Sequence, residues 1–278
     1  MNKTILEEIR QFEDTLRENE KAPQTIQKYV REVLFFMEFL NGEPITKANL
    51  LNYREYLQID HKARTVNGKL SALNAYLEYT GRDDCKVKLL KVQQNVFIDE
   101  ERDLSEAEYK RLLTAAKNKK NSRLYHVMLT ICGTGIRVSE LRFITVEAVK
   151  SRKAEIQMKG KIRTIILPKE LVRKLERYAK EQDIRSGILF RTRNGKPLDR
   201  SNICHDMKKL CETARVNSQK VFPHNLRHLF AKSYYAIERN LARLADILGH
   251  SSVETTRIYV ATCVREHERT IQKMRLII

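Results

Sequence analysis

Residues 133–141 read GTGIRVSEL, and this stretch is the clearest guide to the fold of the 278-residue chain. Three further signatures follow it in order: Lys159-Gly160-Lys161, His224-Asn225-Leu226-Arg227-His228, and Leu248-Gly249-His250, with Tyr259 nine residues after His250. Together they supply arginines suited to clamping a phosphate, groups that can donate or accept protons, and a phenol that can act as a nucleophile. That inventory favours the cutting and rejoining of a nucleic-acid backbone.

The charge of the chain agrees with a polyanionic partner. Lys and Arg outnumber Asp and Glu by 53 to 35, which gives a formal net charge of +18. Residues 1–94 hold 15 basic and 14 acidic side chains, whereas residues 95–278 hold 38 and 21. The C-terminal part is therefore expected to carry the main electrostatic footprint for nucleic acid.

Composition also indicates the cellular compartment and argues against a bound metal or cofactor. No run of about 18 apolar residues suggests a membrane span, and Glu7 and Glu8 interrupt any apolar signal core, so we expect a cytoplasmic protein. The five cysteines are scattered without the paired spacing of a zinc site, and they are expected to be reduced thiols. No metal and no cofactor are expected.

Helical periodicity dominates the first 94 residues. Apolar residues recur every three or four positions, Pro23 suits a helix start, and Asn41-Gly42 and Thr80-Gly81 suit helix ends. The expected helices span about 3–19, 23–41, 46–59 and 63–80. The pattern predicts a compact helical unit over 1–94, a linker over 95–103 and a second domain over 104–278.

The second domain is predicted to be mainly helical with one β-hairpin. Ser105 and Glu108 have capping-box spacing, and two strand-like segments, 153–158 and 162–167, meet at Lys159-Gly160-Lys161. Helices are expected at about 105–117, 121–132, 169–182, 199–214, 224–237, 241–248, 252–257 and 264–274.

The four signatures, in this order and spacing, resemble the tyrosine recombinase family, which includes phage integrases and the Xer-type and Cre-type site-specific recombinases. The resemblance covers the whole chain in outline and is strongest from Gly133 to Tyr259. It implies a two-domain DNA clamp, with a helical core-binding domain of the SAM-like type before the catalytic domain.

By this resemblance, Arg137 and Arg227 clamp the scissile phosphate, since a guanidinium offers a rigid fork to two oxygens and stays charged. Tyr259 is the nucleophile that forms a 3′-phosphotyrosyl bond. The ordinary pKa of a phenol is about 10, so the attack needs a base or a strongly cationic site. His224 is expected to take the phenol proton, and His250 to hydrogen-bond the phosphate.

Lys159 is the expected general acid that protonates the departing 5′ oxygen, with Lys161 close enough to compete for the role. Met158 stands where the family usually has glycine, which leaves the geometry of the hairpin open. Glu140 and His228 are expected to orient the site without contacting the phosphate. His224 and His228 also have a zinc-like spacing, but Arg227 between them would repel a cation.

The resemblance further implies double-stranded DNA with inverted-repeat sites as the partner, a dimer on each site and a tetramer in the synapse. The segment 264–278 is expected to dock into a neighbouring protomer. Two segments are predicted to contact DNA through polar and basic side chains: Lys62, Arg64, Asn67 and Lys69, and then Arg200, Lys208 and Lys209.

Two alternatives remain open from the sequence. A type IB topoisomerase would use the same phenol chemistry to relax supercoils, and strand exchange between two sites would separate it from a recombinase. A catalytically silent DNA-binding relative would bind DNA without forming a covalent adduct.

Overall fold

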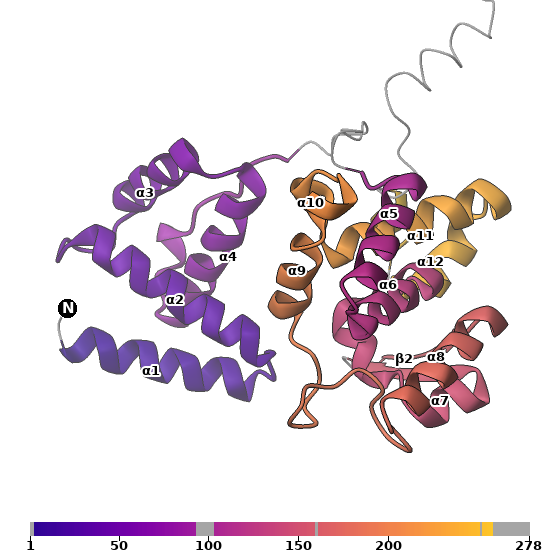
Figure 1. Cartoon of the computed structure of the whole chain (residues 1–278). Helices are drawn as coiled ribbons and strands as arrows, with labels where there is room; N and C mark the ends of the chain where they lie inside the picture. Colours follow the sequence, from indigo (N-terminus) through magenta and orange to yellow (C-terminus); the bar gives the residue numbers. More distant parts are fainter. Residues whose placement is uncertain (1–2, 93–102, 159–160, 251, 258–278) are drawn as a thin grey trace, which may run out of the picture. The chain divides into compact units, whose positions relative to one another are not determined.

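The computed structural model describes residues 3–92, 103–158, 161–250 and 252–257 (Figure 1). The chain separates into two compact units, Met1–Gln94 and Asn95–Ile278. Both are built mainly from helices, and the second also holds a two-stranded antiparallel sheet. The predicted fold class is confirmed. None of the helices in the described ranges is long and apolar enough to cross a bilayer.

The N-terminal unit contains the predicted helices with small changes at their ends. They are α1 (Lys3–Glu18), α2 (Pro23–Leu40), α3 (Lys47–Asp60) and α4 (Ala63–Tyr79), followed by the 3-10 turn η1 (Asp83–Cys85). Pro23 occupies the first turn of α2, and Asn41 ends that helix in the left-handed conformation. Thr46 caps α3, because its hydroxyl accepts a hydrogen bond from the backbone N–H of Asn49.

The core of this unit lies between the apolar faces of its helices. Phe12, Phe36 and Tyr76 are almost fully buried there with a set of leucines. Two asparagines of α4 also hold the extended segment that follows it. Asn74 exchanges two hydrogen bonds with the backbone of Val87, at 2.9 and 3.1 Å, and Asn67 does the same with Leu90, at 2.8 and 2.7 Å. The compact unit thus extends beyond α4 and η1 at least to Leu90.

The C-terminal unit begins with α5 (Glu106–Asn118) and α6 (Ser122–Thr134). After the 3-10 segment η3 (Val138–Phe143) and α7 (Val146–Ser151) come the strands β1 (Lys153–Met158) and β2 (Lys161–Ile166). The remaining elements are α8 (Lys169–Glu181), α9 (Arg200–Lys208), α10 (Cys211–Ala214), η4 (Ser218–Lys220), α11 (Pro223–Glu238), α12 (Leu241–Leu248) and α13 (Val253–Arg257).

Helix α6 is the central element of this unit, packed by α5, α8 and α11. Its side chains are buried on nearly all sides, as expected for a helix surrounded by others. The capping box predicted at the start of α5 is confirmed: the Ser105 hydroxyl accepts from the Glu108 N–H, and the Glu108 carboxylate accepts from the Ser105 N–H. Gly135 ends α6 in the left-handed region, with φ of 66°.

The structure corrects one predicted helix and adds short helical elements, among them η1, η3, α7 and η4. The helix expected over 199–214 is interrupted, because the Leu210 N–H bonds to the carbonyl three residues back and the Lys119 ammonium takes the Lys209 carbonyl at 2.7 Å. The elements η3 and α7 were not predicted. They fill the stretch between α6 and β1, where the sequence shows too few turns for periodicity to be read.

Candidate active site

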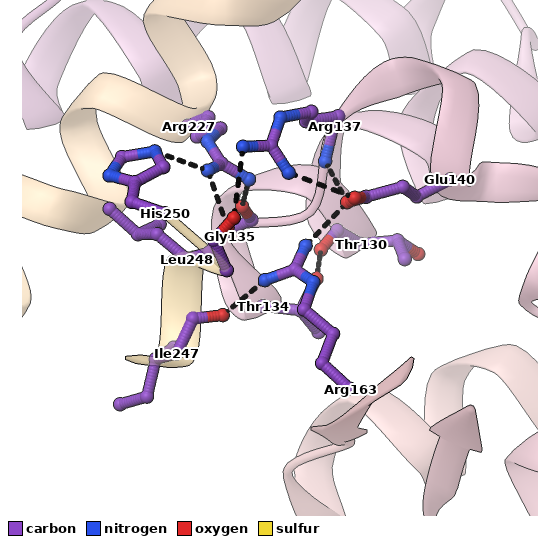
Figure 2. A network of polar contacts seen from close by, with 11 residues as sticks. Thr130, Thr134, Gly135, Arg137, Glu140, Arg163, Arg227, Ile247, Leu248 and His250 are labelled. Carbon is purple, nitrogen blue, oxygen red and sulfur yellow. Dashed lines mark hydrogen bonds and ion pairs between the residues drawn. The ribbon is translucent and has the colours of Figure 1, made fainter. Parts of the chain in front are cut away.

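Arg227 is the centre of the polar cluster formed by the sequence signatures. It lies in the second turn of α11, and only 1 % of its surface is exposed. One guanidinium nitrogen, Nη1, donates to the carbonyl oxygen of Gly135 at 2.6 Å. The other, Nη2, donates to the Leu248 carbonyl at 2.8 Å and lies 2.9 Å from Nε2 of His250. Arg227 therefore connects the ends of α6 and α12 (Figure 2).

Two glycines of the signatures are required for this connection. Gly135 ends α6 and Gly249 ends α12, each in the left-handed region, with φ of 66° and 63°. A side chain on Gly135 would overlap the ring of Phe230, and one on Gly249 would lie 2.5 Å from Cδ of Arg163. The signatures thus specify backbone turns as well as chemical groups.

Three arginines share the carboxyl end of α12. The carbonyl oxygens of Ile247, Leu248 and Gly249 accept, in turn, from Arg163 Nη1, Arg227 Nη2 and Arg137 Nη2. The last carbonyls of a helix have no partner within it and carry the negative end of its dipole. They therefore stabilise three neighbouring positive charges that would otherwise repel one another.

Glu140 holds two of these arginines from the opposite side. It is 2 % exposed, and its Oε2 accepts from the Arg137 N–H and from Arg163 Nη2, each at 2.6 Å, while its Oε1 accepts from Arg137 Nη1 at 3.1 Å. Figure 2 shows the carboxylate between the two guanidinium groups. Glu140 was predicted to orient the site, and the geometry has it fixing both the backbone and the side chain of Arg137.

Arg227 fixes the tautomer of His250. A guanidinium can only donate, so Nε2 accepts from Arg227, and the ring proton sits on Nδ1, which lies 2.8 Å from the hydroxyl oxygen of the buried Thr256. Burial, reinforced by the charges of Arg227, Arg137 and Arg163, lowers the pKa of His250 to about 4. The imidazole is therefore neutral at physiological pH.

His224 lies three residues before Arg227, in the first turn of α11 and at the exposed edge of the cluster. Partial removal from water lowers its pKa, and the charges of Arg227, His228, Arg200 and Arg137 lower it further. A neutral histidine at this edge can accept a proton. Because the charge of Arg200 contributes to this lowering, the start of α9 lies near the site.

This arrangement of two arginines, two histidines and a buried carboxylate is accompanied by matches to known families. Residues 102–265 match the model of the phage integrase family, and residues 9–83 match the phage integrase N-terminal SAM-like domain. The chain belongs to the phage integrase family. The predicted family is confirmed.

Individual relatives agree with the family match. The tyrosine recombinase XerA of Thermococcus kodakarensis is 29% identical over 98% of this chain and 96% of its own length. A crystal structure of XerA recombinase matches 97% of this chain and 98% of its own, with 25% identity and a TM-score of 0.55. The fold is also that of a lambda integrase dimer bound to a COC′ core site, at 16% identity, 91% and 94% coverage and a TM-score of 0.72. The matches favour a recombinase over a topoisomerase.

His228 of this integrase-family chain contacts a residue that the sequence did not single out. Its Nδ1 lies 3.0 Å from the carboxylate of Asp103, which also binds the Lys232 ammonium at 2.7 Å. Burial alone would raise the pKa of Asp103, but the hydrogen bonds from His228 and Lys232 outweigh it and lower that pKa. His228 thereby attaches Asp103, the last residue of the predicted linker, to the helix that carries His224 and Arg227.

Several predicted residues lie outside the described ranges, or have side chains that do. Lys159, Tyr259 and the segment 264–278 fall there, as does the side chain of Lys161. The described residues bracket Lys159, because β1 ends at Met158, β2 begins at Lys161 and these two residues pair across the hairpin. The sequence remains the basis for the roles of Lys159 and Tyr259.

The predicted DNA-contact residues differ in how they are placed. Lys62 and Arg64 are exposed at the start of α4. Asn67 uses both atoms of its amide on Leu90, and Lys69 forms a 2.6 Å ion pair with the buried carboxylate of Glu32. In the C-terminal unit Arg200, Lys208 and Lys209 are all exposed on α9 or at its end, and Lys209 pairs with Asp206 at 3.3 Å.

The sequence reasoning missed Arg163, Thr256 and Asp103. Arg163 had a detectable signal: it lies two residues before the buried Ile165, so both side chains are on the inward face of β2, where a charge needs a partner. Thr256 and Asp103 acquire their roles only through contacts made across the fold. Among the described residues no group of three or more His, Cys, Asp or Glu side chains is arranged to hold a metal ion.

Proposed function

We propose that this chain is a site-specific DNA recombinase that cuts and rejoins DNA strands through a 3′-phosphotyrosyl bond at Tyr259. The phenol oxygen attacks the scissile phosphorus as the bond to the 5′ oxygen breaks. His224 takes the phenol proton, and Lys159 gives a proton to the departing 5′ oxygen. Attack by a 5′ hydroxyl of the partner strand reverses the same steps, so the exchange needs neither a nucleotide nor a metal ion.

The observation that carries this proposal is the cluster of Arg137, Arg227, His224 and His250, brought to one place from three separate signatures. Attack on a phosphodiester increases the negative charge on its nonbridging oxygens, and fixed cationic donors stabilise that charge most effectively. The side chain of Arg137 is 42 % exposed, so its fork is accessible to a phosphate while Glu140 holds its base.

The tautomer of His250 suggests how the cluster adapts to a bound phosphate. In the structure Nε2 accepts from Arg227, whereas hydrogen bonding to a phosphate oxygen requires a proton on Nε2. The Thr256 hydroxyl can either accept from Nδ1 or donate to it. Rotation of this hydroxyl would allow the ring proton to move to Nε2 once a phosphate engages Arg227.

The N-terminal unit and the exposed face of α9 are proposed to grip the DNA. Lys62 and Arg64 on one unit, with Arg200, Lys208 and Lys209 on the other, would contact phosphates. Lys69 stays in the proposed contact set with its charge shared by Glu32, whereas the amide of Asn67 is committed to the backbone of Leu90. The set supports double-stranded DNA as the partner.

Assembly follows from the family. A lambda integrase has been solved as a dimer on a core site and as a tetramer on a Holliday junction. We extend this to two protomers on each inverted-repeat site and four in the synapse, with segment 264–278 docking into a neighbouring protomer. The reaction would take place on cytoplasmic, nucleoid-associated DNA.

A covalent-trapping experiment tests the proposal. A duplex site is first selected from random DNA by binding to the wild-type protein, and a nick is placed beside the scissile phosphate so that cleavage cannot be reversed. Wild-type protein in EDTA is expected to form an adduct that survives a denaturing gel, and Tyr259→Phe is expected to form none. Binding without an adduct by either protein would indicate a silent DNA-binding relative, and relaxation of supercoils without exchange between two sites would indicate a topoisomerase.

A further inference from the structure

Arg163 is a mostly buried cation that the proposed chemistry does not use. It lies on β2, opposite Ile156 in the hairpin, and its side chain is 15 % exposed. Burial lowers the pKa of its guanidinium, while Glu140 raises it, and an arginine remains charged at any physiological pH. Placing this charge in the interior costs free energy that only specific partners offset.

Its partners lie on two segments that position the phosphate-binding side chains: the segment with Arg137 and Glu140, and the end of α12 before His250. Nη2 donates to Glu140, the carboxylate that fixes Arg137, and Nη1 donates to the carbonyl of Ile247, in the last turn of α12 before His250. Its aliphatic stem lies against Gly249, where an added carbon would be 2.5 Å from Cδ. In Figure 2 the Arg163 side chain extends between Glu140 and Ile247.

The hairpin and the clamp depend on each other through this side chain. A two-stranded hairpin is marginally stable alone, and the outer face of β2 carries Ile162 and Ile166, which are 70 % and 74 % exposed. Arg163 gives the hairpin a polar anchor in the C-terminal unit. In return it supplies the second cation that keeps Glu140 in the position from which it orients Arg137.

We propose that Arg163 is a positioning residue for cleavage: it braces Glu140 and the Ile247–Gly249 turn so that Arg137, Arg227 and His250 converge on one phosphate. This inference rests on the proposed function. Arg163 does not contact the phosphate itself. Because a displacement of about 1 Å at a reacting centre can cost about 100-fold in rate, removing the brace is expected to slow cleavage strongly while leaving DNA affinity nearly unchanged.

The test compares cleavage rates on three versions of the nicked site, with saturating full-length protein. One has the natural phosphate, one has a neutral methylphosphonate at the scissile position, and one has sulfur in place of the bridging 5′ oxygen. A neutral phosphonate makes the clamp less necessary, whereas a sulfur leaving group makes the general acid less necessary, because a thiol is far more acidic than an alcohol.

Arg163→Met is expected to cleave the natural phosphate about 100-fold more slowly than wild type but the methylphosphonate within about fivefold of wild type. Arg137→Met should give the same pattern, and Arg163→Lys an intermediate rate with the same selectivity. The matched control is Lys153→Met, which removes an exposed charge from the other strand of the hairpin and should change neither rate. If Arg163→Met fails to fold, the selectivity of Arg163→Lys decides the question.

Three results would overturn the inference. Equal slowing of all three substrates would mean that Arg163 only maintains the fold, and rescue by sulfur alone would mean that it acts through the general acid. Wild-type rates in both Arg163 variants would exclude any role. If wild-type protein binds the sites but forms no adduct on any of them, the proposed function itself fails, and that outcome is separate from a change in selectivity.

Discussion

Replacing Glu140 by glutamine tests whether a single buried carboxylate organises the clamp. The substitution keeps the shape of the side chain but removes its charge and turns one acceptor into a donor. The carboxylate accepts three hydrogen bonds, two of them at 2.6 Å, and one of its partners, Arg163, is mostly buried. Removing one partner of a buried ion pair costs about 3–5 kcal/mol. Since Arg137 is partly exposed and can be rehydrated, we expect the free energy of unfolding to fall by about 3 kcal/mol, at the lower end of this range.

A loss of that size is easily measured. For a unit of this length, about 1 kcal/mol lowers the Tm by about 2–4 °C, so the C-terminal transition should fall by about 6–12 °C. The chain has no tryptophan, which makes far-UV circular dichroism the appropriate signal. Covalent adduct formation should slow by about 10–100-fold, equivalent to about 1.4–2.7 kcal/mol.

Glu155→Gln provides the matched control. Glu155 lies on β1 opposite Thr164 and is exposed, so the same change of chemistry should alter stability by less than about 0.5 kcal/mol. If Glu140→Gln also stays within about 0.5 kcal/mol of wild type and cleaves at the wild-type rate, the reasoning from buried hydrogen bonds to clamp geometry is refuted.

Three further predictions concern proton position, pH and DNA contacts. Thr256→Val should slow cleavage by about fivefold to tenfold through loss of one buried hydrogen bond, while Thr256→Ser should retain the rate in the same adduct assay. The low pKa of His250 means that the folded state resists its protonation. Its contribution to stability is complete above about pH 6.5 and declines by on the order of 3 kcal/mol as the pH falls toward 4, and an NMR titration should place its midpoint near 4. Changing Lys62 and Arg64 together to alanine should reduce the salt dependence of DNA binding by about two counterions, whereas Asn67→Ala should leave that slope unchanged and destabilise the N-terminal unit by about 1–3 kcal/mol.

Each of these has a contrary outcome. Equal rates for the valine and serine variants at position 256 would remove the hydroxyl from the mechanism, and a His250 midpoint above 6 would mean that the ring is hydrated and not buried among cations. A loss of DNA affinity in Asn67→Ala without a loss of stability would mean that this side chain contacts DNA as first predicted.

The helices were predictable because their signals are local. Apolar spacing, Pro23, Ser105 with Glu108 and the glycines at helix ends each act within a few residues, and the structure reproduces the corresponding boundaries closely. The interruption at Lys209 was not predictable in this way. It involves a carbonyl captured by Lys119, which lies 90 positions earlier in the chain.

The same distinction between local signals and contacts across the fold applies to the candidate site. The signatures identified the groups that would react, because phosphate chemistry restricts which side chains can serve. They did not reveal that three arginines share consecutive carbonyls at the end of α12, or that Arg227 sets the tautomer of His250 while Thr256 lies against its other ring nitrogen. Asn67 was predicted to contact DNA with its neighbours at the start of the helix; the structure adds that its amide binds Leu90, a contact that only the folded segment after α4 reveals.

The central claim is a covalent bond between Tyr259 and DNA, and the most direct measurement is the mass of the modified peptide. Wild-type protein is trapped on the nicked site in EDTA, the DNA is trimmed with nuclease and the protein is digested. The account predicts a peptide carrying a 3′-linked nucleotide on Tyr259 and on no other of the 11 tyrosines. A nucleotide on a different residue, or unmodified Tyr259 in protein that demonstrably cleaved the site, would contradict it.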